Sequence, residues 1–187
     1  MRKLICYESI SLDGYFVDAG GDMSWAHKRD DEWNAFVASN ASGGGTLVFG
    51  RKTYDLMAGY WPTPMAKKDA PQVADQMNNL KKIVFSKSMT RADWINTTLL
   101  KGDLATEVRN LKQQDGEGMC IMGSGTIVAQ LAQENLIDEY QIALNAIVLG
   151  KGRTLFDGVR RKINLKLTNS RAFKNGNLFL TYEPAAS

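Results

Sequence analysis

Histidine and cysteine are scarce in this sequence, because its 187 residues include only one histidine and two cysteines. A zinc site usually needs about four such ligands, so the sequence argues against zinc. Cys6 and Cys120 each lie inside an apolar run that is typical of a buried strand. We expect both thiols to pack as small hydrophobic groups, and neither a disulfide nor a cysteine nucleophile is predicted.

Long apolar segments are also missing, so the sequence predicts no membrane span. Arg2 and Lys3 lie at the amino terminus, but Glu8 interrupts the apolar run that follows, which argues against a signal peptide. The net charge of +3 is too small to indicate nucleic-acid binding, and no basic run alternates with aromatic residues. These absences predict a cytoplasmic protein whose partners include neither a membrane nor a nucleic acid.

The composition is that of a globular protein, with 44% hydrophobic and 23% charged residues. A chain of this length buries a substantial core without disulfides. No internal repeat, low-complexity tract or linker-like stretch divides it. We therefore expect a single domain over residues 1–187.

The chain is organised around residues 46–54, Thr-Leu-Val-Phe-Gly-Arg-Lys-Thr-Tyr. The apolar residues predict a short buried strand, which Gly50 ends directly before Arg51, Lys52 and Thr53. If a helix begins there, its first free N–H groups and the positive end of its dipole point at one spot. Such a spot binds phosphate, and two cations and a hydroxyl lie beside it. The alternative is an ordinary strand-to-helix turn with solvated cations.

Two further apolar runs, residues 82–86 and 119–122, end in a similar way. The first run ends in Ser86, Lys87 and Ser88, and the second run is followed by Gly-Ser-Gly-Thr at residues 123–126. In open α/β sheets, ligands bind outside the carboxyl ends of the strands, so we expect the three ends to form one phosphate site. The Gly-x-Gly spacing is weak by itself, and Thr126 is a candidate cap of the following helix.

The pattern of apolar residues predicts an α/β fold. We expect strands to alternate with helices in the first part of the chain, and the Asn-Gly pair at 175–176 predicts a hairpin near its end. Despite the Asp13-Gly14 turn signal, the apolar residues of 11–17 predict that the first strand bends and continues. The sheet is therefore expected to be mixed and mostly parallel, with a C-terminal antiparallel hairpin and helices on both faces. The predicted helices cover residues 28–39, 66–80, 103–114 and 127–135, and the remaining strands cover residues 3–10, 97–100, 140–149, 163–173 and 177–182.

A second group of candidates lies on the amino-terminal side. Asp30 and Asn34 are four residues apart on a predicted helix, so they share a face that differs from the face of Trp33. A carboxylate on an inward face could hold a cationic or amide-bearing ring, whereas a first-turn acid also stabilises a helix dipole. Trp25 follows a glycine-rich loop, which either lies over a ligand or is an ordinary surface loop. Both questions stay open at this point.

Together, the three strand ends offer cations, hydroxyl donors and a glycine turn. A dinucleotide with an extra 2′-phosphate needs these groups. Arg51 and Lys87 would favour the phosphorylated nicotinamide cofactor, NADPH, over the plain one.

Five short motifs carry a resemblance to a known family over nearly the whole chain. The sequence resembles the three-layer dihydrofolate reductase-like fold, and specifically the reductase domain of bacterial riboflavin biosynthesis and its stand-alone relatives. The motifs are Ser11-Leu-Asp-Gly14, Gly50-Arg-Lys-Thr-Tyr54, Ile83-Val-Phe-Ser86, Gly123-Ser-Gly-Thr126 and Leu149-Gly-Lys-Gly-Arg-Thr-Leu-Phe156.

The resemblance implies where NADPH binds. Arg51 and Lys87 would contact the 2′-phosphate, the turn at 123–126 would contact the pyrophosphate together with Lys52 and Thr53, and the nicotinamide would lie beneath the loop that contains Trp25. The complete expected cofactor set is Tyr15, Phe16, Gly50, Arg51, Lys52, Thr53, Ser86, Lys87, Ser88, Gly123, Ser124, Gly125 and Thr126.

The substrate side is less specific. Asp30 matches the acid that binds the pterin in dihydrofolate reductases, but its neighbours Arg29, Asp31 and Asn34 are polar, where a folate pocket expects apolar walls. The resemblance implies a homodimer that reduces a small heterocycle as a 5-amino-6-(5-phosphoribosylamino)uracil reductase does. The alternatives are dihydrofolate reduction and a nucleotide- or pterin-binding relative without catalysis. The candidate acids are Asp13 and Asp30, and the candidate substrate contacts are Trp25, Asn34 and Trp61.

Overall fold

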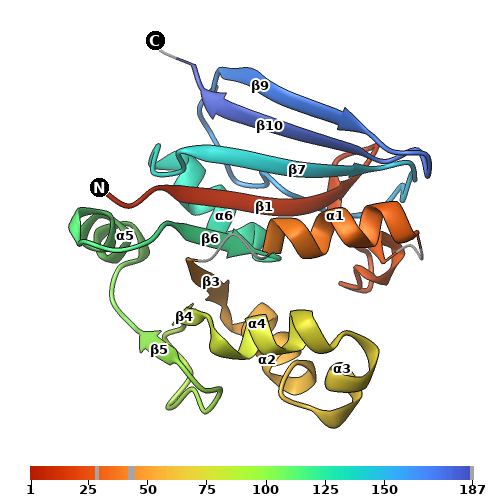
Figure 1. The fold of residues 1–187 in the computed structure, drawn as a ribbon. Helices are drawn as coiled ribbons and strands as arrows, with labels where there is room; N and C mark the ends of the chain where they lie inside the picture. Colours follow the sequence, from red (N-terminus) through yellow and green to blue (C-terminus); the bar gives the residue numbers. More distant parts are fainter. Residues whose placement is uncertain (28–29, 42–44, 186–187) are drawn as a thin grey trace.

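One eight-stranded sheet runs through the computed structural model, which describes residues 1–27, 30–41 and 45–185 (Figure 1). The sheet order is β5-β4-β3-β6-β1-β7-β10-β9. β10 is antiparallel to both of its neighbours, and the other pairings are parallel. The prediction of a mixed, mostly parallel sheet with a C-terminal hairpin is therefore confirmed. The strands are β1 (Leu4–Ser11), β3 (Thr46–Gly50), β4 (Lys81–Phe85), β5 (Thr97–Leu100), β6 (Met119–Met122), β7 (Glu139–Asn145), β9 (Leu165–Ala172) and β10 (Leu178–Pro184).

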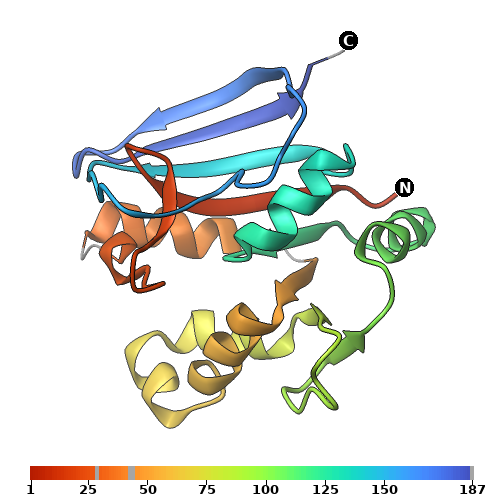
Figure 2. The same cartoon turned by 180° about the vertical axis from the view of Figure 1, so that it is seen from behind.

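Helices cover both faces of this sheet, as predicted (Figures 1 and 2). A short antiparallel pair, β2 (Tyr15–Asp18) and β8 (Gly152–Thr154), forms a separate two-stranded sheet. The helices are the 3₁₀ turn η1 (Ser24–Ala26), α1 (Asp31–Ala41), α2 (Arg51–Tyr60), α3 (Pro64–Asp69), α4 (Pro71–Asn79), α5 (Leu104–Gln113) and α6 (Gly125–Gln133).

The core follows the alternation of side chains along the strands. On β1, Leu4 and Cys6 are buried in the cluster that includes residues of α5 and α6. Tyr7 points to the other face, where it packs with Trp33 and Phe36 of α1. Parallel strands β1, β3, β4 and β6 place their carboxyl ends at one edge, which is the edge at which the predicted cofactor segments begin.

Three local predictions need correction. The helix predicted over 66–80 is two helices, because Pro71 begins α4 and Ala70 before it has a non-helical backbone. The first strand does not continue through 11–17: β1 ends at Ser11, and Gly14 turns the chain with a φ of +85°. The cap of α6 is also different, because this helix begins at Gly125. Thr126 therefore lies inside the first turn.

The remaining boundaries agree with the predictions to within a few residues, except that β7 ends at Asn145. Residues 28–29, where the first predicted helix begins, lie outside the described residues. Asp103 caps α5 as predicted, because its Oδ1 accepts a hydrogen bond of 2.9 Å from the Thr106 amide. Within residues 1–27, 30–41 and 45–185, no helix combines the length and the apolar character that a membrane crossing requires.

Candidate functional site

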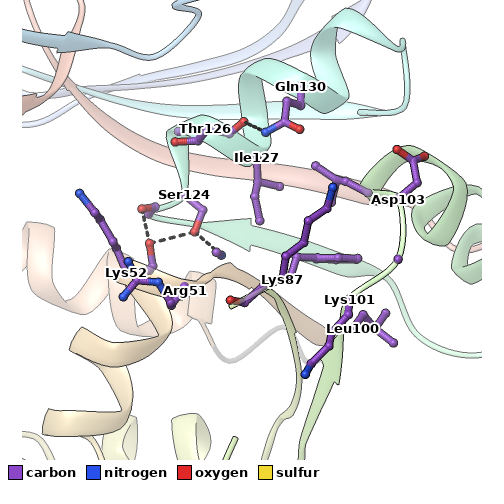
Figure 3. A pocket seen from close by; sticks show the side chains of 18 of the residues that line it. Arg51, Lys52, Lys87, Leu100, Lys101, Asp103, Ser124, Thr126, Ile127 and Gln130 are labelled. Carbon is purple, nitrogen blue, oxygen red and sulfur yellow. Dashed lines mark hydrogen bonds between the residues drawn. The ribbon is translucent and has the colours of Figure 1, made fainter. Parts of the chain in front are cut away.

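A cleft of about 420 Å³ lies at the carboxyl edge of the sheet (Figure 3). It is bounded by the ends of β3, β4, β5 and β6 and by the beginnings of α2, α5 and α6. Its lining consists of Phe16, Gly50, Arg51, Lys52, Thr53, Phe85, Ser86, Lys87, Leu100, Lys101, Gly102, Asp103, Leu104, Gly123, Ser124, Gly125, Thr126, Ile127, Gln130 and Arg153. The three strand ends that the sequence analysis singled out thus meet at one cavity.

Most of the expected cofactor set lines this cleft, but two members do not. The cleft includes Phe16, Ser86, Lys87 and the segments 50–53 and 123–126. Tyr15 and Ser88 are outside it, although each directly adjoins a lining residue in the sequence. The expected catalytic and substrate residues, Asp13, Trp25, Asp30, Asn34 and Trp61, also lie outside the cleft.

A chain of hydrogen bonds joins the ends of β3 and β6. The Ser124 hydroxyl accepts a 3.0 Å bond from the Gly50 amide and donates a 2.9 Å bond to Thr53 Oγ1. The Thr53 hydroxyl in turn donates to the Gly123 carbonyl over 2.7 Å. Thr53 and Ser124 are buried, so their hydroxyls clamp the two strand ends together. These two protons are already used within the protein and are not free for a phosphate.

A buried carboxyl group, that of Glu8, accepts a hydrogen bond from the same turn at Ser124. Glu8 on β1 is 1% exposed, and its Oε1 accepts a 2.8 Å hydrogen bond from the Ser124 amide. Its Oε2 is buried without a hydrogen-bond partner among the described residues. Burial raises the pKa of Glu8 to about 8, although the bond from Ser124 acts in the opposite direction. Glu8 is therefore largely protonated at neutral pH.

Phe16 of β2 packs on the first residue of α6. A Cβ atom at Gly125 would lie only 2.5–2.8 Å from carbon atoms of the Phe16 ring, so only glycine fits there. The Arg153 guanidinium of β8 lies 5.0 Å from the centre of the same ring, within the range of a cation–π contact. The small β2–β8 sheet thus contributes an aromatic wall and a cation to the cleft.

The cleft is strongly positive. Five lining residues carry a positive charge and Asp103 alone carries a negative one, so its formal net charge is +4 (five minus one). Asp103 is engaged in capping α5, and the Thr106 amide and hydroxyl lower its pKa. Arg51 forms an exposed ion pair of 3.3 Å with Asp55, which competes weakly for its charge. The lining cations are Arg51, Lys52, Lys87, Lys101 and Arg153.

The cations reach the cleft from different sides. Lys87 extends from the end of β4 toward α6 and α5, whereas Lys101 points away from α6 (Figure 3). Beside Lys87, Ser86 Oγ accepts a 3.1 Å bond from the Met89 amide and lies 3.4 Å from Ser88 Oγ. A phosphate in this part of the cleft would have ammonium and hydroxyl groups on one side.

The remaining donors are backbone amides. The first amides of α2 and α6 have no acceptor within their own helices, and both helices begin at the cleft. The Ser124 amide donates to Glu8 and the Ile127 amide donates to the Ser124 carbonyl, which leaves the amides of Gly125 and Thr126 in the first turn of α6. At α5 the Asp103 carboxylate already occupies the positive helix end. The arrangement therefore offers anion sites at α2 and α6.

Asp13 has a structural role. Its Oδ1 accepts bonds from the Ser11 hydroxyl, over 2.6 Å, and from the Leu149 amide, over 3.1 Å, and its Oδ2 accepts one of 2.8 Å from the Gly150 amide. The Ser11 hydroxyl is the largest cause of a lowered pKa for Asp13, and the two amides add to it. A carboxyl group with a lowered pKa is a poor proton donor at neutral pH, which weakens its candidacy as a catalytic acid.

The other amino-terminal candidates are also engaged in local structure. Asp30 Oδ1 accepts a 2.7 Å bond from the Trp33 amide, as a residue that caps α1 does. Asn34 is exposed on that helix. The Trp25 indole donates to the Asp22 carbonyl over 3.1 Å, and the Trp61 indole contacts the Met57 sulfur at 3.1 Å. The structure does not bring these residues together with the cleft.

The site also contains residues that were not predicted from the sequence, among them Lys101, Arg153 and Glu8. Lys101 directly follows a predicted strand, so the rule that identified Lys87 would also have found it. Arg153 lies inside the motif over 149–156 but was given no role there. Glu8 interrupts an apolar strand, and a charged residue in such a place is a signal for a buried ionisable group.

Comparisons with known proteins place this architecture in a family. The family model of the RibD C-terminal domain matches residues 2–179. The uncharacterized protein YyaP of Bacillus subtilis strain 168 is 27% identical over 185 residues, which cover 97% of this chain and 94% of that protein. A solved structure of a protein named for riboflavin biosynthesis, from Shewanella sp. PV-4, has a TM-score of 0.75 at 23% identity and covers 98% of this chain and 99% of its own.

Two further solved structures have a similar fold. The Thermotoga maritima diaminohydroxyphosphoribosylaminopyrimidine deaminase/5-amino-6-(5-phosphoribosylamino)uracil reductase has a TM-score of 0.70 at 18% identity, over 98% of this chain and 57% of that one. Dihydrofolate reductase from Enterococcus faecalis, complexed with NADP(H), has a TM-score of 0.64 at 14% identity, over 98% and 97%. These likenesses confirm the dihydrofolate reductase-like fold. Because the family match covers nearly the whole chain, this protein belongs to the RibD C-terminal domain family.

Proposed function

We propose that this protein is an NADPH-dependent reductase that transfers hydride to a phosphorylated ribosylaminopyrimidine or a related heterocycle. The family supports a reductase, and the Thermotoga maritima relative carries this type of reductase in its name. The observation that carries the proposal is the cleft itself. There, the beginnings of α2 and α6 and five cations surround one cavity.

The donors of the cleft fit a dinucleotide with a 2′-phosphate. We assign the 2′-phosphate to Arg51 and Lys87, with Ser86 and Ser88 beside them, and Lys101 is an additional cation in reach of this region. For the pyrophosphate we assign the first amides of α2 and α6, with Lys52 as counter-charge. Thr53 and Ser124 act by holding the two helix ends at a fixed separation.

The chemistry required of the protein is modest. NADPH supplies the hydride when it is bound. The chain must hold the dinucleotide, orient its nicotinamide end and exclude water from it. We assign that end to Phe16, which lines the cleft, and to the adjacent Tyr15.

The first test is a binding titration with NADPH and NADH in parallel, followed by nicotinamide fluorescence. We expect micromolar NADPH binding. Arg51→Ala and Lys87→Ala should each weaken it by roughly 1.5–3 kcal/mol, because each removes a charged partner of the phosphate, while NADH binding changes little.

The matched control is Lys67→Ala, which removes an exposed cation of α3 that is outside the cleft. It should leave both affinities unchanged. Equal losses for NADPH and NADH would contradict the 2′-phosphate assignment. Binding of neither cofactor would contradict the reductase proposal as a whole.

The second test measures loss of nicotinamide absorbance with a phosphorylated ribosylaminopyrimidine and with dihydrofolate. Turnover of the first substrate supports the proposal. Turnover of dihydrofolate alone would replace it with the folate alternative, even though Asp30 lies outside the cleft. Tight NADPH binding without turnover of either would favour a binding protein without catalysis.

We also propose that the chain forms a homodimer through β9. This edge strand is exposed at every one of its 8 residues, and it presents Leu165 and Leu167, which are 37% and 49% exposed. An exposed edge of this kind is a template for pairing with another strand. Light scattering after size exclusion should give a dimer mass, and Leu167→Lys should give a monomer. A monomeric wild-type protein would contradict this proposal.

A further inference from the structure

The buried Glu8 side chain is the feature of the cleft that the proposed function leaves unexplained. A glutamate at 1% exposure needs a strong reason, because burying an unpaired carboxylate costs several kcal/mol. Glu8 forms no ion pair among the described residues, and only one of its two carboxyl oxygens has a hydrogen-bond partner. Its single partner is the Ser124 amide, at the turn that begins α6. Among the described residues, the hydrogen bonding of this carboxyl group is therefore directed at the turn that begins α6.

The hydrogen bonds continue from Glu8 to the cleft. The Ser124 amide donates to Glu8, and the Ser124 hydroxyl accepts from the Gly50 amide and donates to Thr53 Oγ1. The Glu8 carboxyl group is thus hydrogen-bonded to Ser124, which directly precedes α6. Through Ser124 it is connected to Gly50, which directly precedes α2. A charge at this position is one hydrogen bond from Ser124, the residue that directly precedes the α6 amides to which we assign the pyrophosphate.

We propose that Glu8 is a positioning residue whose proton couples to anion binding: its carboxyl group accepts from the α6 turn, and its ionisation weakens the binding of an anionic ligand at that turn. This inference rests on the proposed function for the identity of the ligand, but its physical content concerns any phosphate or pyrophosphate in the cleft. A carboxylate under the cradle repels the anion, and by linkage the bound anion raises the proton affinity of Glu8.

Other ionisable groups near Glu8 do not compete in the relevant pH range. On β1 and β6, burial raises the pKa of Tyr7 and Cys120 to about 12, and that of Cys6 well above its ordinary value. On β7, burial raises the pKa of Tyr140 to about 12. Helix α6 carries no ionisable side chain.

Other ionisable side chains on neighbouring elements include Glu139 of β7, Tyr15 and Asp18 of β2, and Arg51, Lys52 and Asp55 of α2. Lys82 also has a pKa near 8, lowered by burial. It lies near the amino end of β4, where it donates to the carbonyls of Met77, Asn78 and Leu80, and the cleft is at the opposite end of the sheet.

The test measures NADPH affinity between pH 7 and pH 9, where the 2′-phosphate is already ionised. For the wild type we expect the dissociation constant to rise by roughly five- to tenfold across this range, as Glu8 loses its proton. Glu8→Gln keeps the oxygen that accepts from Ser124 but cannot ionise. Its dissociation constant should change by less than about twofold. Lys82 is present in both proteins. Any effect of Lys82 on the pH dependence of the dissociation constant therefore also appears in Glu8→Gln.

A second measurement needs no variant. Calorimetry at pH 8 in two buffers of different ionisation enthalpy should show an uptake of roughly half a proton per bound NADPH. Equal pH slopes for the two proteins, or no proton uptake, would overturn the inference while leaving the reductase proposal intact. If NADPH does not bind, the same measurements are made with inorganic pyrophosphate. Because pyrophosphate itself exchanges protons in this pH range, the readout is then the difference between the two proteins. Proton uptake on pyrophosphate binding that is present in the wild type and reduced in Glu8→Gln would support the inference without the reductase. No anion binding would overturn both.

Discussion

The two sides of this molecule use their charged residues for different purposes. On the cleft side, five cations and two helix beginnings surround a cavity, and their charge is not balanced by the single acid in the lining. On the amino-terminal side, Asp13 and Asp30 each accept hydrogen bonds from nearby backbone amides and serve a turn and a helix end. The difference is that the positive charge of the first set exceeds the negative charge of the cleft lining, whereas the carboxylates of the second set are held by hydrogen bonds of the fold.

This contrast explains why the cofactor half is better defined than the substrate half. Charges without partners in a cavity point to a ligand that supplies the opposite charge. A capping carboxylate gives no such indication, because the fold already explains it. Glu8 lies between the two cases, since it holds one amide and leaves one oxygen unpaired.

Among substitutions on the cleft side, we expect Gly125→Ala to cause the largest loss of stability and of NADPH binding. The new Cβ would lie within 2.8 Å of the Phe16 ring, so the ring or the α6 turn must move. We expect a loss of about 3 kcal/mol in the free energy of unfolding, measured by urea denaturation, and loss of NADPH binding. The matched control is Gly59→Ala in α2, where no atom lies within 4 Å of the added methyl group. The control should be slightly stabilising, as alanine is in a helix. Equal effects of the two would contradict the close Phe16 contact.

A smaller effect is expected from Ser124→Ala, which cuts the connection between β3 and β6. It leaves the Gly50 amide without its acceptor and removes the donor to Thr53. The free energy of unfolding should fall by about 1–2 kcal/mol, and NADPH affinity should fall with it. Ser88→Ala, at an exposed hydroxyl beside the same cleft, should change stability by less than about 0.5 kcal/mol. A neutral Ser124→Ala would show that the clamp contributes nothing.

The smallest effect concerns the amino-terminal side, where Asp13→Asn tests whether Asp13 is structural. The lowered pKa of Asp13 means that its carboxylate stabilises the fold above the pKa of the unfolded chain. That contribution is lost as the pH falls through the folded-state pKa. The variant should therefore melt below the wild type at neutral pH, and the two melting temperatures should converge in acid. Equal melting temperatures at neutral pH, with hydride transfer abolished, would instead make Asp13 catalytic.

Much of the fold follows from local sequence signals. The apolar runs ending at Gly50 and Gly123 predict two parallel strands, and the carboxyl ends of such strands meet at one edge. The Asn-Gly pair at 175–176 predicts the final hairpin for a similar reason, because that pair suits a tight turn. In each case the residues that give the signal lie within a few positions of the element that they predict.

The features that sequence did not predict depend on contacts between distant segments. Arg153 reaches the cleft only because β8 pairs with β2, and the pairing brings it over Phe16. The hydroxyls of Thr53 and Ser124 look like phosphate donors in the sequence, but they satisfy each other across 71 positions. The break at Pro71 is different, because a proline inside a helical pattern is itself a local signal that a helix ends before it or begins at it.

The most direct test of this account is a crystal structure of the protein grown with saturating NADPH. We expect the pyrophosphate to lie within hydrogen-bonding distance of the first amides of α2 and α6, and the 2′-phosphate to lie beside Arg51 and Lys87. A dinucleotide bound elsewhere, or one whose phosphates avoid the beginnings of α2 and α6, would contradict it.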